Sequence, residues 1–545
     1  MLKAPLPLRK VARAFFLDLR RSNRVPVLLR EKARSLLRLK TVRLGKPLSM
    51  PTPLFRHGVA SGDPLSDRVI LWTRTERSGE VGWTVATDEA LQNVVASGVA
   101  NPEEAHDLTV NVDVTGLEPD TTYYYFFRGG DESSPVGRTR TLSEGGVDLR
   151  FGMYSCAKFN AGYFNAFGRM AERDDLAFIL CLGDYIYEYG NDEKGLGDKI
   201  GRPFVPDHEC RTLQDYRTRY ASYRRDPQLQ RLHQRHPFIN IIDDHEFCND
   251  TWREGAGKHN EAEDGPWNQR KEAAFRAWRE WIPTRLPDAS DPSRIFRTFH
   301  IGDLADFILL DTRTRRDRQT KDLDEMEHAD RTLLGGHQFT WFVDQCEKTR
   351  AKWRIIVNSV MMGQVKSDFM PEELGNPLSE LGVLTKREHG PEPDQWDGYP
   401  VERRRVLETI RQHVDHNVVF LSGDCHSSWA MDIKFDPHDP ATESLGGEFC
   451  TTSVTSENLD DDAGWHPRSK SLEIEKEIID KNPHIHWCEA DSHGFVVVDI
   501  TPERVQGDWW FVNQIHVPSD GIHHGGSWLI QSEEDRVRRS GGPVT

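Results

Sequence analysis

The sequence predicts an α/β protein in which a layered sheet domain follows an all-β domain. Five short apolar runs end abruptly in polar residues, and runs of this length are typical of buried strands. They begin near residues 150, 176, 238, 353 and 418. Amphipathic stretches between them predict helices. These stretches cover 165–173, 213–232, 269–281 and 402–414. Polar residues at strand ends along one sheet edge are where open α/β folds bind ligands.

The length of 545 residues exceeds what one ordinary hydrophobic core supports, so two or more domains are expected. The composition, 37% hydrophobic and 29% charged, is that of a globular protein. No run approaches the ~18 apolar residues that a membrane span needs. We expect four segments. They are a basic segment 1–53, a β-sandwich domain 54–142, a larger α/β domain 148–515 and a C-terminal surface tail 516–545.

Charge is unevenly distributed along the chain. Residues 1–50 hold 14 Lys and Arg against two acids, a charge of +12, so residues 51–545 carry -29 of the total of -17 (-17 - 12). An acidic body does not favour polyanions, so we expect no specific nucleic-acid partner. The same charge is compatible with binding hard cations.

The basic segment 1–50 has three competing interpretations. Arg20-Arg21 is similar to a twin-arginine export signal, but Arg24, Arg30 and other charges interrupt the place where an apolar stretch should follow. A helix with basic and apolar faces would instead lie on an anionic membrane surface or serve as a transit segment. The third interpretation is a flexible tail or a misjudged start. The cellular location is therefore left undetermined.

Residues 54–142 consist of short β-rich runs separated by Gly, Pro and Asp, which predicts an all-β sandwich of the fibronectin or immunoglobulin type. Leu117–Tyr123 matches the tyrosine-corner turn of such sandwiches. We expect this domain to pack against the larger α/β domain, with partner binding as the alternative. Later in the chain, the polar segments 188–212 and 364–400 are long enough to shape an active site, and 364–400 is a candidate lid.

The eight cysteines show neither CxxC pairs nor dense spacing, so they predict no disulfide framework. Most are expected to be buried thiols, Cys425 among them. Cys156 follows the first apolar run and has three interpretations: a metal-binding thiolate, a nucleophile or a small buried hydrophobe. The metal-binding residue types that follow the other apolar runs favour the first interpretation, a metal-binding thiolate.

Gly183-Asp184-x-x-Tyr187 is the most informative strand end. Asp184 is well placed to bridge two cations, because an unpaired carboxylate would be costly to bury there. A phenolate from Tyr187 would favour a trivalent cation such as Fe(III), whose charge depresses the phenol pKa. The alternative is a capping Asp followed by buried aromatic residues.

Two further strand ends carry carboxylates and imidazoles. Asp243–Glu246 places Asp244 and His245 together, with Asn249 just beyond, and such oxygen ligands suit Ca²⁺ or Mg²⁺. The alternative is a set of first-turn acids that stabilise a helix. Asp424 and His426 add a carboxylate and an imidazole that converge if their loop turns.

These motifs, in this order, resemble the PhoD-like family of alkaline phosphatases and phosphodiesterases, within the calcineurin-like metallophosphoesterase superfamily. The similarity covers most of residues 54–510. Besides the strand ends it includes Arg56–Pro64, Leu310–Arg313, Trp396–Pro400, Leu421–Trp429 and Thr452–Ser456.

The resemblance implies an N-terminal β-sandwich and an α/β/β/α catalytic domain that holds Fe(III) with one or two Ca²⁺. It also implies that His245 faces the leaving group and that Asp184 serves both metals. The implied iron ligands are Cys156, Asp184, Tyr187 and His426, and the implied calcium ligands are Asp184, Asp244, Asn249 and Asp424.

The chain departs from these relatives in two respects. Asn358 stands where the wider superfamily often has a histidine, which suits calcium better than zinc. The family is typically extracytoplasmic, whereas the N-terminus shows no convincing signal.

The resulting hypothesis is hydrolysis of phosphate monoesters or diesters by a metal-bound hydroxide at an Fe(III)/Ca²⁺ centre. The alternatives are a membrane-associated phosphodiesterase or phospholipase-type enzyme that uses residues 1–50, and a non-catalytic binding protein. We expect a monomer.

Overall fold

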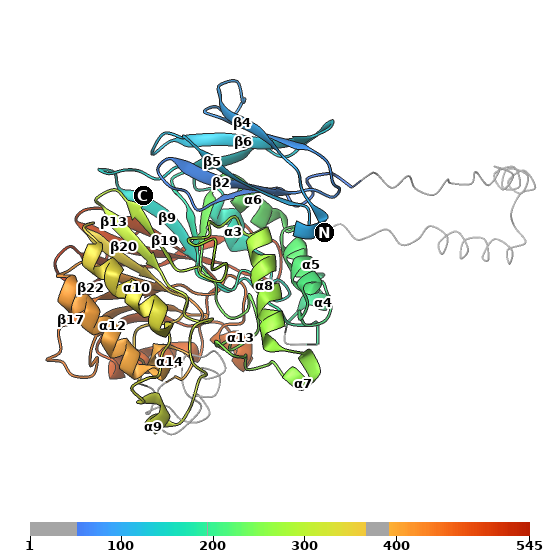
Figure 1. Ribbon diagram of the computed structural model, residues 1–545. Coiled ribbons are helices and arrows are strands. Elements are labelled where there is room, and N and C mark those ends of the chain that lie inside the picture. The colour runs from blue at the N-terminus through green and yellow to red at the C-terminus, as the bar shows by residue number, and fades with distance from the viewer. Residues whose placement is uncertain (1–51, 193–194, 367–391, 545) are drawn as a thin grey trace, which may run out of the picture. The chain divides into compact units, whose positions relative to one another are not determined.

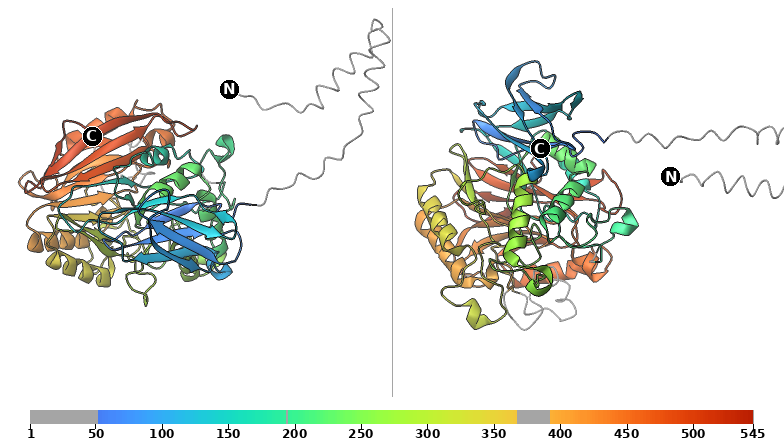
Figure 2. Two further views of the ribbon diagram at one scale, coloured as in Figure 1. Left: turned by 90° about the horizontal axis from the view of Figure 1, so that it is seen from above. Right: turned by 45° about the vertical axis from the view of Figure 1, so that its right-hand side comes forward.

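The computed structural model describes residues 52–192, 195–366 and 392–544, and these form one compact unit from Pro53 onward. Two β-sheets lie face to face, and helices cover the outer face of each (Figures 1 and 2). This is an α/β/β/α arrangement preceded by an all-β region, so the predicted fold class is confirmed. Within the described ranges, no helix combines the length and apolar composition that a membrane crossing requires.

The larger sheet has ten strands in the order β22-β21-β20-β19-β9-β10-β11-β1-β2-β5. Its centre is parallel: β9, β10 and β11 run side by side and point the same way. These three are Leu149–Tyr154, Ile179–Cys181 and Pro237–Asn240. On one side lie β19 (Gly494–Ile500), β20 (Arg504–Val512), β21 (Ile522–Gln531) and β22 (Val537–Arg539). On the other lie β1 (Val59–Gly62), β2 (Arg68–Arg74) and β5 (Thr109–Thr115).

The second sheet has seven strands in the order β12-β13-β14-β15-β17-β16-β18, with β13, β14, β15 and β17 parallel. The strands are β12 (Arg297–Ile301), β13 (Ala305–Leu309), β14 (Trp353–Val357), β15 (Val418–Ser422), β16 (Ser428–Lys434), β17 (Ser444–Cys450) and β18 (Ile485–Glu489). Side chains from both sheets meet between them, where Phe151 of β9 contacts Phe307 of β13 at a ring distance of 5.4 Å. Strands buried on both faces explain the continuous apolar runs in the sequence.

Four helices cover the outer face of the ten-stranded sheet, and three cover that of the seven-stranded sheet. The first set is α3 (Asn165–Met170), α5 (Leu213–Tyr223), α6 (Pro227–Arg235) and α8 (Trp267–Trp281). The second is α10 (Gly335–Lys348), α12 (Pro400–His413) and α14 (Ser471–Lys481). Short helices lie in the connections: α4 (Gly197–Ile200), α7 (Glu261–Asp264), α9 (Leu323–Met326) and α13 (Leu459–Ala463).

The helix predicted over 213–232 is two helices. Asp226 accepts hydrogen bonds from the backbone N–H groups of Gln228 and Leu229, and Pro227 occupies the first turn of α6. An N-cap followed by proline begins a new helix, because proline lacks the N–H that a continuing helix needs. Asp226 and Pro227 therefore indicate a helix boundary, although the apolar periodicity continues across it.

The predicted N-terminal β-sandwich is present, but one of its sheets continues into the catalytic sheet. A five-stranded sheet of β3 (Val81–Ala86), β4 (Val94–Ala100), β6 (Thr122–Gly129), β7 (Glu132–Ser133) and β8 (Gly137–Arg140) packs over β1, β2 and β5 around a shared apolar core. Strand β1 pairs in parallel with β11. The tyrosine corner is also present: the backbone N–H of Glu118 donates to the Tyr123 hydroxyl over 2.8 Å.

The expectation of a surface tail over 516–545 is wrong. Most of this stretch forms β21 and β22, which extend the ten-stranded sheet, and Ile530 and Val537 are buried between the sheets. Its glycines and charged residues occupy the exposed face and the turn. They interrupt the alternation of apolar and polar residues by which a strand is predicted from sequence. The candidate lid 364–400 lies mostly outside the described residues, as do residues 1–51 of the basic segment.

Candidate metal centre

The predicted strand ends of both sheets meet at one place between them. Cys156 follows β9, Asp184 follows β10 and Asp244 follows β11, while Asp424 follows β15 of the other sheet. A tight approach joins the two sheets here, since a Cβ atom on Gly423 would lie 2.6 Å from the Ser155 Oγ. Only glycine fits at such a contact.

The first group of candidate ligands is Cys156, Asp184 and His426, whose ligand atoms lie within 4.8 Å of one another. Tyr187 joins them: its hydroxyl is 3.0 Å from Asp184 Oδ2 and 3.3 Å from His426 Nε2. A thiol, a carboxylate, an imidazole and a phenol are thus assembled around one point.

The second group consists of carboxylates. Asp184, Asp243, Asp244 and Asp424 place oxygens within 4.8 Å of one another, and Asp184 also groups with Asp244 and His245. Asp184 is therefore common to both groups, which is the place of a bridging ligand. Asn249, a predicted calcium ligand, is half-buried, and its side-chain oxygen accepts from the Tyr189 hydroxyl over 2.7 Å.

The backbone of these ligands is held in an unusual conformation. Cys156, Asp184, Asp424 and His426 have φ values of 58°, 54°, 64° and 49°, in the left-handed region that residues other than glycine rarely adopt. Such conformations persist where the surrounding structure enforces them, and they cluster at functional sites. Glu246 is one restraint, because its carboxylate accepts the backbone N–H groups of Asp184, Tyr185 and Asp243.

The carboxylates of the second group are crowded together. Burial and neighbouring carboxylates together raise the pKa of Asp184 and Asp243 well above the usual range and that of Asp424 to about 7, although His245 lowers the first and Arg313 lowers the other two. Asp244 Oδ1 is buried without a hydrogen-bond partner among the described residues. Crowded, buried acids with an unused oxygen are the environment that a bound cation would relieve, so the residues fit a metal centre.

Arg313 is a site residue that the sequence analysis did not assign. Its buried guanidinium donates to both oxygens of Asp243 and, over 2.8 Å, to Asp424 Oδ1; it also pairs with Asp394 at 2.7 Å. Asp243, which the alternative interpretation made a helix-stabilising acid, accepts from Arg313. The sequence did carry one indication of this role: Leu310–Arg313 directly follows strand β13, just as each of the other motifs directly follows a strand.

The segment 453–457, after β17, contacts three of the candidate ligands. Ser456 donates from its hydroxyl to the Tyr187 oxygen over 2.9 Å. The Glu457 carbonyl lies 2.9 Å from Nδ1 of His426, so that nitrogen is the donor, and Nε2, which faces the Tyr187 hydroxyl, is the nitrogen that can bind a metal. The backbone N–H of Ser456 donates to the Cys156 carbonyl over 3.3 Å. Lys158 fixes the segment through an ion pair with Glu457 at 2.7 Å.

His245 stands beside the two groups. Its Nδ1 is 2.7 Å from the Glu188 carboxylate, and its ring stacks on Tyr187 at 4.0 Å. Burial lowers the pKa of His245, but Asp244, Asp184 and Glu188 outweigh burial and raise it well above its usual range. These neighbouring carboxylates therefore favour the protonated form of the imidazole.

Asn358 has a structural role. Its NH₂ group donates to the Leu421 carbonyl over 3.2 Å, and its oxygen accepts from the Trp396 ring N–H over 2.9 Å. Both ends of the amide are thus occupied in holding β14, β15 and the Trp396 turn together.

A further acidic group and a further pocket lie outside this centre. Glu188, Glu209 and Cys248 also converge, but the Arg270 guanidinium already pairs with Glu209 at 2.7 Å.

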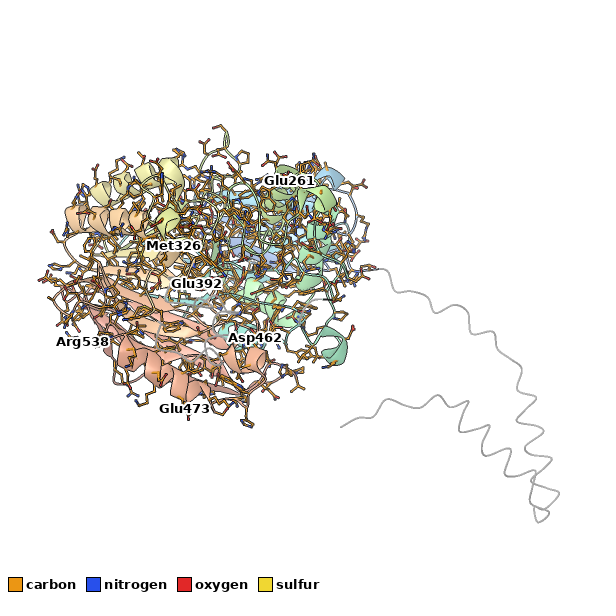
Figure 3. All side chains as sticks on the ribbon, turned by 90° about the horizontal axis from the view of Figure 1, so that it is seen from below. Glu261, Met326, Glu392, Asp462, Glu473 and Arg538 are labelled. Atoms are coloured by element: carbon orange, nitrogen blue, oxygen red, sulfur yellow. The ribbon has the colours of Figure 1, made fainter. Side chains whose placement is uncertain are left out.

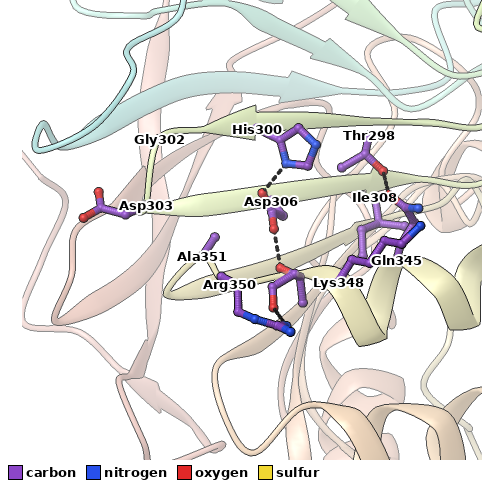
Figure 4. A pocket seen from close by; sticks show the side chains of 11 residues that line it. Thr298, His300, Gly302, Asp303, Asp306, Ile308, Gln345, Lys348, Arg350 and Ala351 are labelled. Carbon is purple, nitrogen blue, oxygen red and sulfur yellow. Dashed lines mark hydrogen bonds and ion pairs between the residues drawn. The ribbon is translucent and has the colours of Figure 1, made fainter.

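A pocket of about 430 Å³ beside β12 holds the pair His300–Asp306, 2.7 Å apart (Figure 4). Exposed charges such as Glu261, Glu473 and Arg538 lie at the periphery of the face seen from below (Figure 3).

Comparison with known proteins finds two family models that match the chain. The model of the PhoD-like phosphatase family matches residues 151–509, and the model of the PhoD-like phosphatase N-terminal domain matches residues 44–143. The chain is 34% identical to alkaline phosphatase D of Bacillus subtilis (strain 168) over 513 residues, which cover 89% of this chain and 82% of that protein.

Two solved structures are similar in fold. A structure of PhoD superposes with a TM-score of 0.78 and 32% identity, covering 91% of this chain and 94% of that one. A purple acid phosphatase from yellow lupin seeds superposes with a TM-score of 0.51 and 11% identity, covering 87% and 73%. The second similarity bears on the fold alone.

Proposed function

The chain belongs to the PhoD-like phosphatase family and is a phosphoric ester hydrolase, and from this premise we propose that its strand-end cluster holds Fe(III) and Ca²⁺ on the two sides of Asp184. The observation that carries the proposal is that Asp184 belongs to both groups of converging ligand atoms. Paired cations of this kind activate water and neutralise the oxygens of a phosphate ester.

The two groups differ in the chemistry of their donors. Cys156, Tyr187 and His426 offer sulfur, phenolate oxygen and nitrogen, a set that supports a trivalent iron. Asp244, Asn249 and Asp424 offer only oxygen, the preference of Ca²⁺. Because Asp184 and Asp244 are buried and Asp244 Oδ1 lacks a hydrogen-bond partner among the described residues, the cluster favours a bound cation over an empty state.

His245 is the proposed proton donor to the leaving-group oxygen. Glu188 receives Nδ1–H, which leaves Nε2–H directed away from Glu188 and available for donation. The stack on Tyr187 fixes the ring plane beside the first group of ligands. An alkoxide or phenoxide leaves the phosphorus slowly unless its oxygen is protonated. A proton donated by His245 would therefore accelerate the departure of the leaving group.

Elemental analysis combined with two assays tests the proposal. The purified full chain should contain iron and calcium, and it should hydrolyse p-nitrophenyl phosphate, bis-p-nitrophenyl phosphate or both. Chelation should abolish turnover and returned calcium should restore it. The ratio of the two rates then ranks monoester against diester. A folded, active protein without iron or calcium would refute the proposed centre while leaving the family activity intact.

Asp184→Asn is the sharpest variant for this test. It should lower the content of both metals together and remove most of the turnover, because the amide removes the negative charge that both cations share. Asp67→Asn is the matched control: the Asp67 carboxylate is half-exposed, and among the described residues it hydrogen-bonds to Arg68 alone. Near-normal turnover and metal content in Asp184→Asn would overturn the bridging role.

A membrane-associated phosphodiesterase is the second candidate, and the basic charge of residues 1–50 supports it. Sedimentation of the full chain and of residues 51–545 with anionic liposomes separates the candidates. Binding that depends on residues 1–50 supports the membrane enzyme, and equal non-binding of both forms refutes it.

A further inference from the structure

Cys425 and Cys450 bring two sulfur atoms into contact beside the metal centre. Cys425 lies between the candidate ligands Asp424 and His426, and Cys450 is the last residue of β17. Their Sγ atoms are 3.2 Å apart, and both side chains are fully buried. A disulfide bond measures about 2.05 Å, so the sulfurs need to approach by only about 1 Å.

The backbone fixes this approach. Strands β15 and β17 pair in parallel with Ser422 opposite Cys450, and the chain then turns at Gly423. The Cys425 N–H donates to the Gly423 carbonyl over 2.7 Å, which folds residue 425 back over the end of β17. Cys450 Sγ lies 3.4 Å from the same carbonyl. The contact between the sulfurs therefore follows from main-chain pairing and a tight turn.

The loop that carries Cys425 is one that needs a restraint. Asp424 and His426, on either side of it, both have left-handed backbones, with φ values of 64° and 49°. Residues other than glycine leave that region readily unless their neighbours hold them there. We propose that a disulfide between Cys425 and Cys450 ties the loop Gly423–His426 to the end of β17.

The bond forms by a balanced exchange. Each thiol loses one hydrogen, the two sulfurs join, and an organic disulfide such as glutathione disulfide is reduced to two thiols. Because both sulfurs are buried in the folded chain, the exchange takes place while the chain folds, and the finished bond is shielded from reductants.

A third cysteine of the same sheet, Cys488, lies two strands away from Cys450. Trp429 of β16 pairs with Cys450 on one side and with Cys488 of β18 on the other. All eight cysteines are described and buried, and Cys425–Cys450 is the pair whose sulfurs are in contact. Identifying the linked residues is therefore part of the test.

The test uses the full chain, refolded with a mixture of reduced and oxidised glutathione. Unfolding in denaturant with an alkylating reagent should label six cysteines, and prior reduction should raise the number to eight. Proteolysis without reduction should yield one linked pair of fragments that contain Cys425 and Cys450. Eight labelled cysteines without reduction, or a link to Cys488, would overturn the assignment.

Two variants make the test independent of metal loading and turnover. Cys450→Ala should release Cys425 for labelling, and Cys346→Ala, a change in a buried cysteine of α10, should keep the link. Reduction should lower the denaturant midpoint of the wild-type chain and of Cys346→Ala but not that of Cys450→Ala. Equal effects of reduction on all three would refute the proposal, even if Cys450→Ala is less stable.

Discussion

Cys156 supplies the thiol of the proposed iron site, and Cys156→Ser tests that role. A serine hydroxyl is a poor replacement for a thiolate. Substitution of a residue that only hydrogen-bonds to a ligand lowers metal affinity by roughly 10–100-fold, so loss of the ligand itself should lower the affinity for iron by more than that. Calcium should be retained, because Cys156 belongs to the group that lacks Asp244. Elemental analysis after dialysis measures both metals. Cys346→Ser is the control, and unchanged iron in Cys156→Ser would make Cys156 a structural thiol.

His245 and Glu188 predict a pH dependence. The pKa of His245 is raised well above its usual range by Asp244, Asp184 and Glu188, although burial lowers it. Once cations neutralise Asp244 and Asp184, Glu188 is the carboxylate left to hold the proton. In Glu188→Gln the pKa should fall, so turnover should decline at a lower pH on the alkaline side while the acidic side stays in place.

The measurement is kcat against pH for wild type, Glu188→Gln and Glu209→Gln. Glu209 belongs to the neighbouring acidic group but pairs with Arg270 and Arg211. An alkaline limb that is identical in all three proteins, or one that moves upward in Glu188→Gln, would exclude His245 as the acid.

Single residues show how far the sequence could predict the site. Asp184, Tyr187, Asp424 and His426 each follow an apolar run, so their position at a sheet edge could be read locally. Arg313 could not be assigned its role in this way, because the role depends on carboxylates far away along the chain.

At the scale of elements, the segment 453–457 has the largest consequence for the centre. Ser456 donates to the Tyr187 oxygen, and such a donor stabilises a phenolate. Ser456→Ala should therefore weaken iron binding by roughly tenfold. The tyrosinate-to-iron charge-transfer band should move to longer wavelength, because an unsolvated phenolate gives up its electron more easily.

Thr455→Val is the matched control for Ser456→Ala. It removes a buried hydroxyl of the same segment that donates to the Lys158 carbonyl over 2.8 Å and contacts no candidate ligand side chain. Absorption spectra and competition with an iron chelator compare the two variants. If the band stays in place in Ser456→Ala, or moves equally in both variants, the Ser456 hydroxyl does not stabilise the Tyr187 phenolate.

Elements also divide into those that the sequence predicts and those that it conceals. Strands β9, β10, β11, β14 and β15 are buried on both faces, so their apolar runs identify them without tertiary information. Strand β21 has the sequence Ile-His-His-Gly-Gly-Ser-Trp-Leu-Ile-Gln, in which one face is half-exposed and glycines interrupt the alternation. Its pairing with β20 decides its structure, and that pairing is not a local property.

At the scale of the whole described unit, the C-terminal strands connect the two sheets. Strands β21 and β22 extend the ten-stranded sheet, while the Val537 N–H donates to Asp432 of β16 over 2.8 Å. Ile530 and Val537 reach Gly447 of β17, where a Cβ atom would lie 2.5 Å from Val537 and 2.7 Å from Ile530. The end of the chain is thus part of the core that places the strand ends of both sheets against each other.

Ile530→Ala should therefore destabilise the protein although it lies far from the metal centre in sequence. The side chain is fully buried, and its truncation should reduce the free energy of unfolding by about 2–5 kcal/mol through lost burial and a residual cavity. Val517→Ala removes a side chain that is 46% exposed and should change stability by less than about 0.5 kcal/mol. Denaturant unfolding compares the two, with the slope against denaturant checked for two-state behaviour. If residues 516–545 were a surface tail, both variants would match wild type; a large loss confined to Ile530→Ala makes this stretch a structural part of the sheet sandwich, on which the geometry of the centre depends.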